Sequence, residues 1–517
     1  MTHRHPSRAG LILLGAILAA LAAGGGPFAS SAPPDQIRDP AVAGQFYPAD
    51  RAKLTAALEG FFADAVPDRG EHPPVLIVPH AGYIYSGQIA ADAFAQVAKM
   101  TIDTVVILGA NHTTAGFDRV SVYDGAAYRT PLGQVEVDRD LAAVLARDGE
   151  VAVLDHRLHE REHSVEVQVP FVQHVFPRAR IVPLVVATAS PGVCARFGRA
   201  LAEAVHGRNV LIVASSDLSH YPAADAAARV DAVTLEQVAS MDAGALVQGE
   251  RDAGGSSTPN LVTRACGLGP VLVAIEAARR LGARRGVVLS YANSASVAVG
   301  SRERAVGYGA VAFAGGDGRP DLGVLRETRP DRASRLEPAE KRRLLRLARD
   351  TVTRYLASET LPLPRGGSPA LLREAGVFVT LRKGRDLRGC VGRLVPEGPL
   401  LRLVSAMALE SALEDPRFSP VRPGELKGLD FEVSVLSPLT RIPGPEFIVP
   451  GRDGVVLELG GRSAVFLPQV AAEEGWGRDE LLDNLALKAG LGREAWRSAG
   501  VRLLTFQADV FRESQFK

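Results

Sequence analysis

Two histidines each follow an apolar segment that is typical of a buried strand. His80 closes VLIVPH, and His112 closes TVVILGANH. Four or five β-favouring residues followed by a loop residue predict parallel strands, and the carboxyl ends of such strands share one edge of a sheet. Because open α/β sheets bind ligands at that edge, both imidazoles are candidate ligand-binding groups.

Further polar residues are predicted at the same edge. Asp217 and His220 lie in SSDLSHY, and Asn293 with Ser294 lies in SYANS, each after another predicted strand. Cys266, in TRACGLGP, lies at the predicted start of a helix. The positive end of a helix favours the thiolate, which is the form of cysteine that binds metals and attacks carbon.

Two imidazoles and one thiolate form a suitable ligand set for iron, copper or zinc, with positions left for water or a substrate. We therefore expect His80, His112 and Cys266 to bind a metal ion. Asp217 and His220 would then support the ligands or move protons during a reaction.

The segment HRLHEREHSVEVQVPF contains weaker candidates. It holds His156, His159, His163 and Glu166, but a charged segment rich in histidine is usually solvated. His163 and Glu166 lie three residues apart and would share one face of a helix. Cys194 lies in the middle of a predicted helix, and we expect it to be a core residue.

The order of the predicted elements indicates the fold of the first domain. Helix-like and strand-like segments alternate from Asp50 to about residue 315, and one predicted helix spans residues 88–100. Alternation of this kind predicts an α/β fold with a doubly wound, largely parallel sheet and helices on both faces. The length of 517 residues leaves room for at least one more domain.

The second part of the chain has a different pattern. Residues 316–336 are rich in Gly, Pro, Arg and Asp, which predicts a linker, and residues 337–517 predict a separate α+β domain. All histidines lie at or before His220. Any imidazole chemistry therefore belongs to the first domain.

Cys390 is the residue of interest in the second domain. It lies in DLRGCVGRL between Gly389 and Gly392, and glycines allow a ligand or another strand to approach closely. Arg388 next to it would lower the pKa of the thiol or hold an anion. A tight turn with a half-buried cysteine is the alternative interpretation.

The N-terminal segment, residues 1–32, has the pattern of a secretory signal peptide. Arg4 and Arg8 precede an apolar run, and small residues follow it. The run is short for a spanning helix, which needs roughly 20 apolar residues, although a short membrane anchor is an alternative. We expect an exported protein, periplasmic or extracellular, or one anchored by its N-terminus. The location would be cytoplasmic if the segment is not a functional signal.

Charge and cysteine content exclude several classes. A formal net charge of +1 gives no indication of nucleic-acid binding, and it suggests membrane contact only through the N-terminal segment. The three cysteines are widely spaced, so the sequence predicts neither a disulfide framework nor a zinc ribbon.

The first domain resembles a known family. The strings RDPAVAGQFYP, VPHAGYIYSG, GANHT, EHSVEVQVPF, SSDLSHY and VGYGA, over roughly residues 38–315, are similar to the Memo family. That family is similar in fold to the class III extradiol dioxygenases, whose iron is held by two histidines and a carboxylate. The resemblance implies a site of His80, His112 and Cys266, accompanied by Asp217 and His220. It also implies iron or copper, with zinc as an alternative. A thiolate in place of the carboxylate argues against ring-opening activity.

The second domain resembles the AMMECR family. The strings DLRGCVGRL, AMALESALEDPRFSPV, FEVSVLSPLTRI and LLDNLALKAGL carry this similarity over roughly residues 337–517. The fusion is similar to the bacterial AmmeMemoRadiSam system, which implies a functional link to a radical-SAM protein. Such enzymes normally work in the cytosol, so export would argue against direct partnership.

Three functions are compatible with these residues. The leading hypothesis is a non-haem, metal-dependent redox protein or oxidoreductase that acts on an unknown small molecule or peptide. A metal-free thiol catalyst is the first alternative, with Cys266 as nucleophile and a nearby histidine as base. A non-catalytic module that binds a peptide or a nucleotide is the second.

Overall fold

The computed structural model describes residues 33, 35–255, 257–325, 336–498 and 500–516. The predicted signal peptide and residues 326–335 of the predicted linker lie outside the described residues. The described chain divides into two compact units. The first ends within the predicted linker and also includes residues 357–363, and the second contains the rest.

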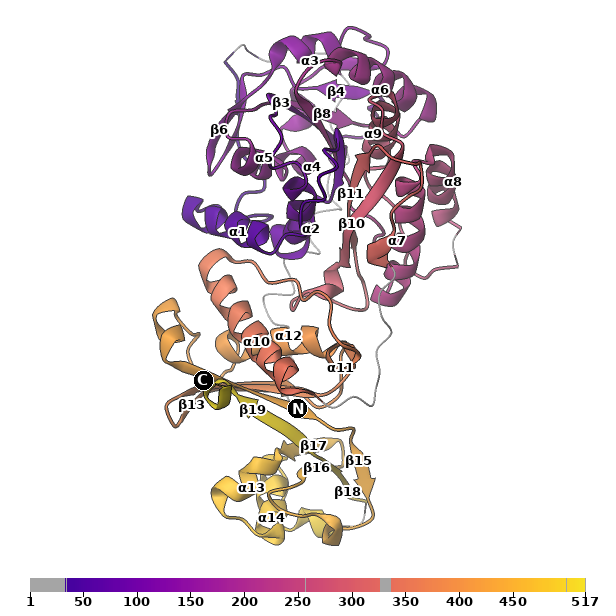
Figure 1. Cartoon of the computed structure of the whole chain (residues 1–517). Helices are drawn as coiled ribbons and strands as arrows, with labels where there is room; N and C mark the ends of the chain where they lie inside the picture. The colour runs from indigo at the N-terminus through magenta and orange to yellow at the C-terminus, as the bar shows by residue number, and fades with distance from the viewer. Residues whose placement is uncertain (1–32, 34, 256, 326–335, 499, 517) are drawn as a thin grey trace. The chain divides into compact units, whose positions relative to one another are not determined.

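The first unit is built on one eight-stranded sheet (Figure 1). The four central strands, β2, β9, β3 and β8, run parallel to one another. On the two sides of this group, β11 runs antiparallel to β2, and β4 runs antiparallel to β8. The predicted α/β class with a largely parallel sheet is therefore confirmed. In spatial order the strands are β10 (Arg285–Asn293), β11 (Gly307–Ala314), β2 (Val75–Val78), β9 (Val210–Ser215), β3 (Thr104–Ala110), β8 (Arg180–Val186), β4 (Val120–Val122) and β7 (Ala152–Leu154).

Helices cover both faces of this sheet. Leu76 of β2 belongs to the apolar core that also contains residues of α1, α2 and α5, while its neighbour Ile77 belongs to the core that contains residues of α3, α6, α7, α8 and α9. Alternate residues of a strand point to opposite faces, so a fully apolar strand needs a helical layer on each side. The helices are α1 (Arg51–Ala63), α2 (Tyr83–Ala95), α3 (Arg139–Leu145), α5 (Val169–Val175), α6 (Pro191–Val205), α7 (Ala224–Ala239), α8 (Ala243–Ala253) and α9 (Leu268–Arg280).

Helix α2 begins earlier than the sequence predicts. It spans Tyr83–Ala95 after the N-cap Gly82, whereas the sequence pattern predicts a helix over residues 88–100. The aromatic and β-branched residues at its start conceal the helix in the sequence. The early start leaves only residues 79–82 between β2 and α2, and this short loop carries His80.

Two small elements accompany the main sheet of the first unit: a small sheet that the sequence does not predict, and a single-turn helix in the segment where the sequence predicts a helical face. One is a sheet of β1 (Ile37–Arg38), β5 (Ala127–Thr130) and β6 (Gly133–Glu136). The other is the single-turn helix α4 (His163–Glu166). A Cβ atom on Gly109 of β3 would lie 2.5 Å from the Ser164 hydroxyl oxygen, so only glycine lets α4 lie this close to the sheet.

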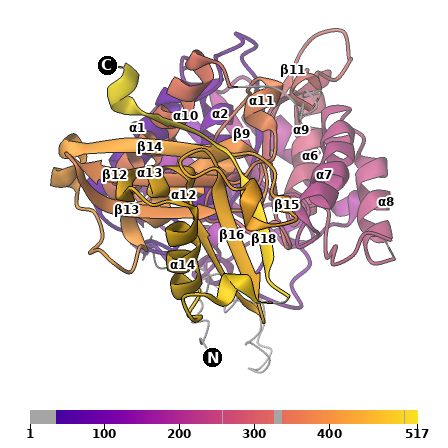
Figure 2. The same ribbon diagram turned by 90° about the horizontal axis from the view of Figure 1, so that it is seen from below.

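The second unit contains two antiparallel sheets of four strands each, with strands β12, β13 and β14 side by side (Figure 2). This arrangement confirms the predicted α+β class. The strands are β12 (Val377–Lys383), β13 (Asp386–Arg393), β14 (Leu429–Leu436), β15 (Thr440–Ile442), β16 (Gly454–Leu459), β17 (Arg462–Phe466), β18 (Arg502–Phe506) and β19 (Ala508–Arg512). The helices are α10 (Pro338–Ser358), α11 (Pro369–Leu372), α12 (Leu400–Leu413), α13 (Pro468–Glu474) and α14 (Arg478–Lys488).

Among the described residues, no helix is both long enough and apolar enough to cross a bilayer.

Candidate metal centre

The two histidines that follow strands lie at one edge of the sheet, as the sequence predicts. His80 follows β2 and His112 follows β3, and both strands run parallel to β9 between them. The centroids of the two imidazole rings are 5.1 Å apart. Each histidine lies two residues beyond its strand, which is enough to turn the rings toward each other at the sheet edge.

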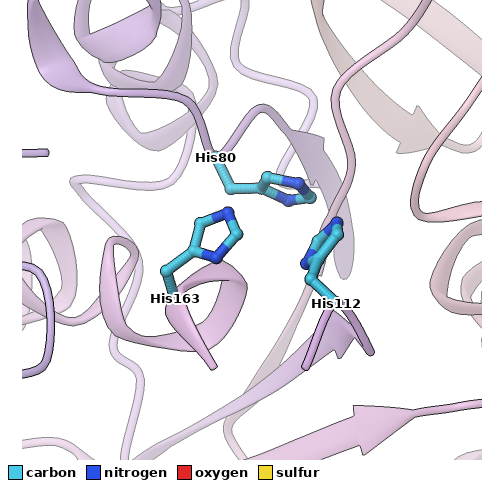
Figure 3. Close-up of side chains that lie close together, drawn as sticks. All are labelled: His80, His112 and His163. Atoms are coloured by element: carbon cyan, nitrogen blue, oxygen red, sulfur yellow. The ribbon is translucent and has the colours of Figure 1, made fainter. Parts of the chain in front are cut away.

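A third imidazole completes a cluster with these two. The ring of His163, at the start of α4, lies 4.7 Å from the ring of His112 and 5.4 Å from that of His80, measured between centroids (Figure 3). One nitrogen of each ring lies within 4.8 Å of the others. Burial lowers the pKa of His163 to about 4, although Glu162 acts in the opposite direction.

His80 is the most deeply buried histidine of the cluster and is only 2% exposed. Its backbone N–H donates to Asp217 Oδ1 at 2.7 Å, and its Nδ1 lies 3.1 Å from the Ser215 hydroxyl. Burial, followed by the other imidazoles, holds the pKa of His80 well below its ordinary value. His80 is therefore neutral, which is the state that a metal ligand requires.

His112 is held by one buried carboxylate. Its backbone N–H and its Nδ1 donate to the two oxygens of Glu162, at 2.7 and 3.0 Å. Burial opposes a charge on His112, but hydrogen bonds to Cys266 and Glu162 outweigh it and raise the pKa of the imidazole to about 10. Burial likewise opposes a charge on Glu162, yet the bond from His112 holds the pKa of Glu162 well below its ordinary value.

Cys266 reaches the same cluster. Its Sγ lies 3.1 Å from His80 Nε2, and it also bonds to His112. Cys266 immediately precedes Gly267, the N-cap of α9, and a Cβ on Gly267 would lie 2.5 Å from the Ser215 carbonyl oxygen. The glycine thus allows the thiol to approach the sheet edge. Burial raises the pKa of Cys266, with the bond to His112 acting in the opposite direction.

The other predicted residues at this edge differ in their roles. Asp217 is buried and accepts from the backbone of His80, so it fixes the His80 loop. The Nδ1 of His220 lies 2.9 Å from a carbonyl oxygen two residues earlier, and the charge of His220 acts on Asp217. Asn293 caps its own turn by accepting from the backbone N–H of residue 295, and the Ser294 hydroxyl accepts from the backbone N–H of residue 306.

His159 and His163 of the histidine-rich segment are not solvated, and for these two residues the sequence interpretation is wrong, although two of the charged residues between them are exposed. His163 faces the cluster, and His159 is fully buried between Tyr128 and Ser121. Glu166 does not accompany His163. Its carboxylate accepts from Arg38, from the Tyr47 hydroxyl and from the backbone of residues 41 and 42.

His159 gives the first prediction, a pH-dependent stability. Burial lowers the pKa of His159 to about 3, from an ordinary 6.5. Between these values the unfolded chain binds a proton and the folded chain does not, so stability is complete above pH 6.5 and falls as the pH drops toward 3. From pH 7 to 4.5 the loss is about 2.5 kcal/mol, at about 1.4 kcal/mol per pKa unit.

Urea unfolding at the two pH values measures this loss. His159→Gln keeps a donor and an acceptor for Tyr128 and Ser121 but removes the titration. We expect the difference in unfolding free energy between pH 7 and 4.5 to shrink by about 2.5 kcal/mol in this variant. An unchanged difference would contradict the prediction.

The two cysteines outside the cluster are Cys194, which is buried, and Cys390, which is partly buried. Cys194 is 1% exposed, and burial raises its pKa to about 12, which confirms it as a core residue. In the second unit, Arg388 donates to Glu425 at 2.9 Å, and burial raises the pKa of Cys390. A Cβ on Gly389 would lie 2.1 Å from the Ser411 carbonyl oxygen, so this glycine allows helix α12 to pack closely.

The donor set of the cluster fits a transition-metal ion. Imidazole and thiolate are the usual ligands of zinc, copper and iron. Bonds of about 2.1 Å would place ligand nitrogens about 3.4 Å apart in a tetrahedral site. The three imidazole nitrogens lie within 4.8 Å of one another, so modest side-chain rotation would bring them onto one ion.

A mixed α/β sheet with imidazoles gathered at its carboxyl edge therefore defines an α/β protein with a candidate metal site. Comparison with known proteins gives the family. The model of the Memo-like protein family matches residues 38–312, and the AMMECR1 model matches residues 345–511. The chain belongs to the Memo family and carries an AMMECR1 domain after the Memo-like domain.

Relatives of the Memo-like domain occur in archaea and bacteria. A MEMO1 family protein of Methanopyrus kandleri is 36% identical, covering 53% of this chain and 98% of its own. One of Methanothermobacter thermautotrophicus is 38% identical, with coverage of 53% and 98%. One of Aquifex aeolicus is 37% identical, with 50% and 92%. In a separate comparison with solved structures, the crystal structure of an uncharacterized protein of Pyrococcus horikoshii is 37% identical to a part of this chain, covering 34% of this chain and 93% of its own, with a TM-score of 0.34.

Proposed function

We propose that the Memo-like domain binds one redox-active metal ion, iron or copper, with zinc as an alternative. In this proposal the ion lies among His80, His112 and His163, and the protein acts as a metal-dependent redox protein or oxidoreductase on a small molecule or peptide. The observation that carries the proposal is the approach of three imidazole nitrogens to within 4.8 Å at the ligand-binding edge of the sheet.

Cys266 is the fourth donor in this proposal. The distance of 3.1 Å from its Sγ to His80 Nε2 supports the assignment. A bound cation would also favour the thiolate in a place where burial alone favours the thiol. The set would then be three nitrogens and one sulfur, rather than the two nitrogens and one sulfur predicted from the sequence.

The remaining polar groups would bind and orient a reactant. The His112 and His163 side chains are 29% and 21% exposed, so a small molecule would approach from their side, with His80 beneath. The metal would supply Lewis-acid or electron-transfer chemistry when bound. Asp217 would hold the His80 loop, and His220 would exchange protons through Nε2 because its Nδ1 faces a backbone carbonyl.

Elemental analysis of protein purified under reducing, anaerobic conditions tests the proposal. We expect about one equivalent of iron, copper or zinc per chain. Loading the metal-free protein with each ion in turn, followed by gel filtration, shows which ion stays bound. A chain that retains none of the three at micromolar concentration would overturn the proposal.

A metal-free thiol catalyst is the second candidate, because Cys266 Sγ lies in contact with an imidazole. The two candidates predict different thiol reactivity in metal-stripped protein. A nucleophilic Cys266 would alkylate quickly near neutral pH, whereas a buried ligand with a raised pKa would alkylate slowly. Rapid alkylation that is lost in Cys266→Ser would favour the thiol catalyst.

Location and partners are proposed from the sequence alone. Residues 1–32 would direct export, and the AMMECR1 domain would link the protein to a radical-SAM pathway. Cell fractionation of the full chain and of a chain lacking residues 1–32 tests both. Full-length protein outside the cytosol would support export and argue against direct partnership with a radical-SAM enzyme. Retention of the full-length protein in the cytosol would argue against export and would be compatible with direct partnership.

A further inference from the structure

Glu162 lies behind the imidazole cluster and contacts two of its rings. Its side chain is fully buried, and Oε1 accepts from His112 Nδ1 at 3.0 Å and from the Ser164 backbone N–H at 2.8 Å. The same oxygen lies 3.5 Å from His163 Nδ1. Oε2 accepts from the His112 backbone N–H at 2.7 Å. One buried carboxylate therefore contacts both of the partly exposed histidines of the cluster, His112 and His163.

These contacts decide which ring nitrogen each imidazole offers to a ligand. An ionised carboxylate only accepts hydrogen bonds, so the Nδ1 of His112 must carry its proton toward Glu162. Its Nε2 is then the nitrogen that is directed away from the carboxylate, and it becomes the donor atom for a metal ion.

His80 has a different partner. The Ser215 hydroxyl donates to the Ser164 carbonyl at 2.7 Å, so its oxygen is left to accept from His80 Nδ1 and from Gln168. His80 is thus also held with Nε2 free, facing Cys266. The partner of His80 is neutral, whereas the partner of His112 and His163 carries a negative charge.

We propose that Glu162 is a positioning residue of the metal centre, which orients His112 and His163 for coordination through Nε2 and supplies the buried negative charge that balances the cation. This inference rests on the proposed metal-binding function. Neither the sequence nor the family comparison assigns a role to Glu162. Carboxylates behind metal-bound histidines typically change metal affinity by about 10–100-fold when removed.

The test compares Glu162→Gln with Glu166→Gln. Glu166 is a matched control because it is a buried glutamate at the end of α4, the helix that Glu162 caps, and its partners are Arg38 and Tyr47 rather than the cluster. We expect Glu162→Gln to weaken zinc affinity, measured by competition with a chelator, by about 10–100-fold. We expect Glu166→Gln to stay within about threefold of the unmodified chain, even where it lowers the melting temperature.

A second measurement does not depend on a bound metal. The Nδ1–H proton of His112 should give a downfield NMR signal protected from exchange in metal-free protein, assigned by its loss in His112→Ala. Glu162→Gln should lose that protection, and Glu166→Gln should keep it. If Glu162→Gln fails to fold, Glu162→Asp takes its place, because its shorter carboxylate withdraws from both rings and should show the same two effects in weaker form.

The outcomes separate the two proposals. Unchanged zinc affinity and an unchanged His112 signal in the Glu162 variant would overturn the positioning role. An unmodified chain that binds no metal would overturn the proposed function and the role of Glu162 in it. In that case, loss of exchange protection of the His112 Nδ1–H signal in Glu162→Gln would still show that the hydrogen bond between His112 and Glu162 is correctly described.

Discussion

Replacing His112 with alanine should lower the metal affinity of the protein by about 100-fold and remove most of the bound metal after gel filtration. Site energies of about 10–16 kcal/mol, divided among four donors, give each donor about 3 kcal/mol. Since every 1.4 kcal/mol is tenfold in the dissociation constant, the loss of one imidazole corresponds to about 100-fold. His112 is part of the nitrogen cluster and is partly exposed, so its removal should disturb the core little.

The control for this variant is His206→Ala, which removes an exposed histidine at the end of α6. It should leave both metal content and affinity unchanged. Parallel measurements on His163→Ala and Cys266→Ser test whether each of these residues is also a ligand. Full metal retention in His112→Ala would remove the basis for a centre among these histidines.

The predicted part of this site follows from a local rule. A histidine just beyond a parallel strand lies at the carboxyl edge of the sheet whatever the rest of the chain does. For this reason His80 and His112 could be predicted from their own short segments. Cys266 could be predicted in the same way from the helix that follows it.

The rest of the site depends on contacts between distant segments. His163 reaches the cluster because α4 packs against Gly109, more than fifty residues earlier, and because Glu162 bonds to His112. The local sequence of that segment is charged and indicates solvent exposure. The string EHSVEVQVPF was visible as part of a family resemblance, but its local pattern does not show which of its polar residues turn inward.

In the second domain, too, some features follow from the local sequence and others depend on contacts between distant segments. Its α+β class follows from the local preferences of its segments. The partner of Arg388 does not, because this side chain pairs with Glu425, far along the chain, instead of acting on the neighbouring Cys390. Gly389 likewise has a packing role against α12 that the sequence alone could not separate from ligand approach.

Replacing Arg38 with alanine should destabilise the first unit by about 3–5 kcal/mol, the largest effect on stability that we expect. Arg38 and Glu166 form an ion pair at 2.7 Å, and their side chains are 3% and 0% exposed. The guanidinium also donates to the carbonyl oxygens of His159 and Glu162. The variant therefore leaves one buried charge and two carbonyls without their partner. Urea unfolding followed by circular dichroism measures the loss.

The second unit of the same chain serves as an internal control for the unfolding measurement on Arg38→Ala. Both tryptophans, Trp476 and Trp496, belong to the second unit, so tryptophan fluorescence reports that unit and should not change. A loss below about 1 kcal/mol would show that the ion pair contributes little, as exposed pairs do.

A double variant separates charge from packing. Breaking a buried pair is costly mainly because it leaves an uncompensated charge, so replacing both partners should be less harmful than replacing one. We expect Arg38→Met with Glu166→Gln to recover about 1–2 kcal/mol relative to Arg38→Met alone. We expect any loss of metal affinity in Arg38→Met to remain in the double variant, because the carbonyls of His159 and Glu162 still lack the guanidinium that holds their segment against β1. Arg38 itself, rather than its ion pair with Glu166, would then act on the metal centre by fixing the segment that carries Glu162 and His163.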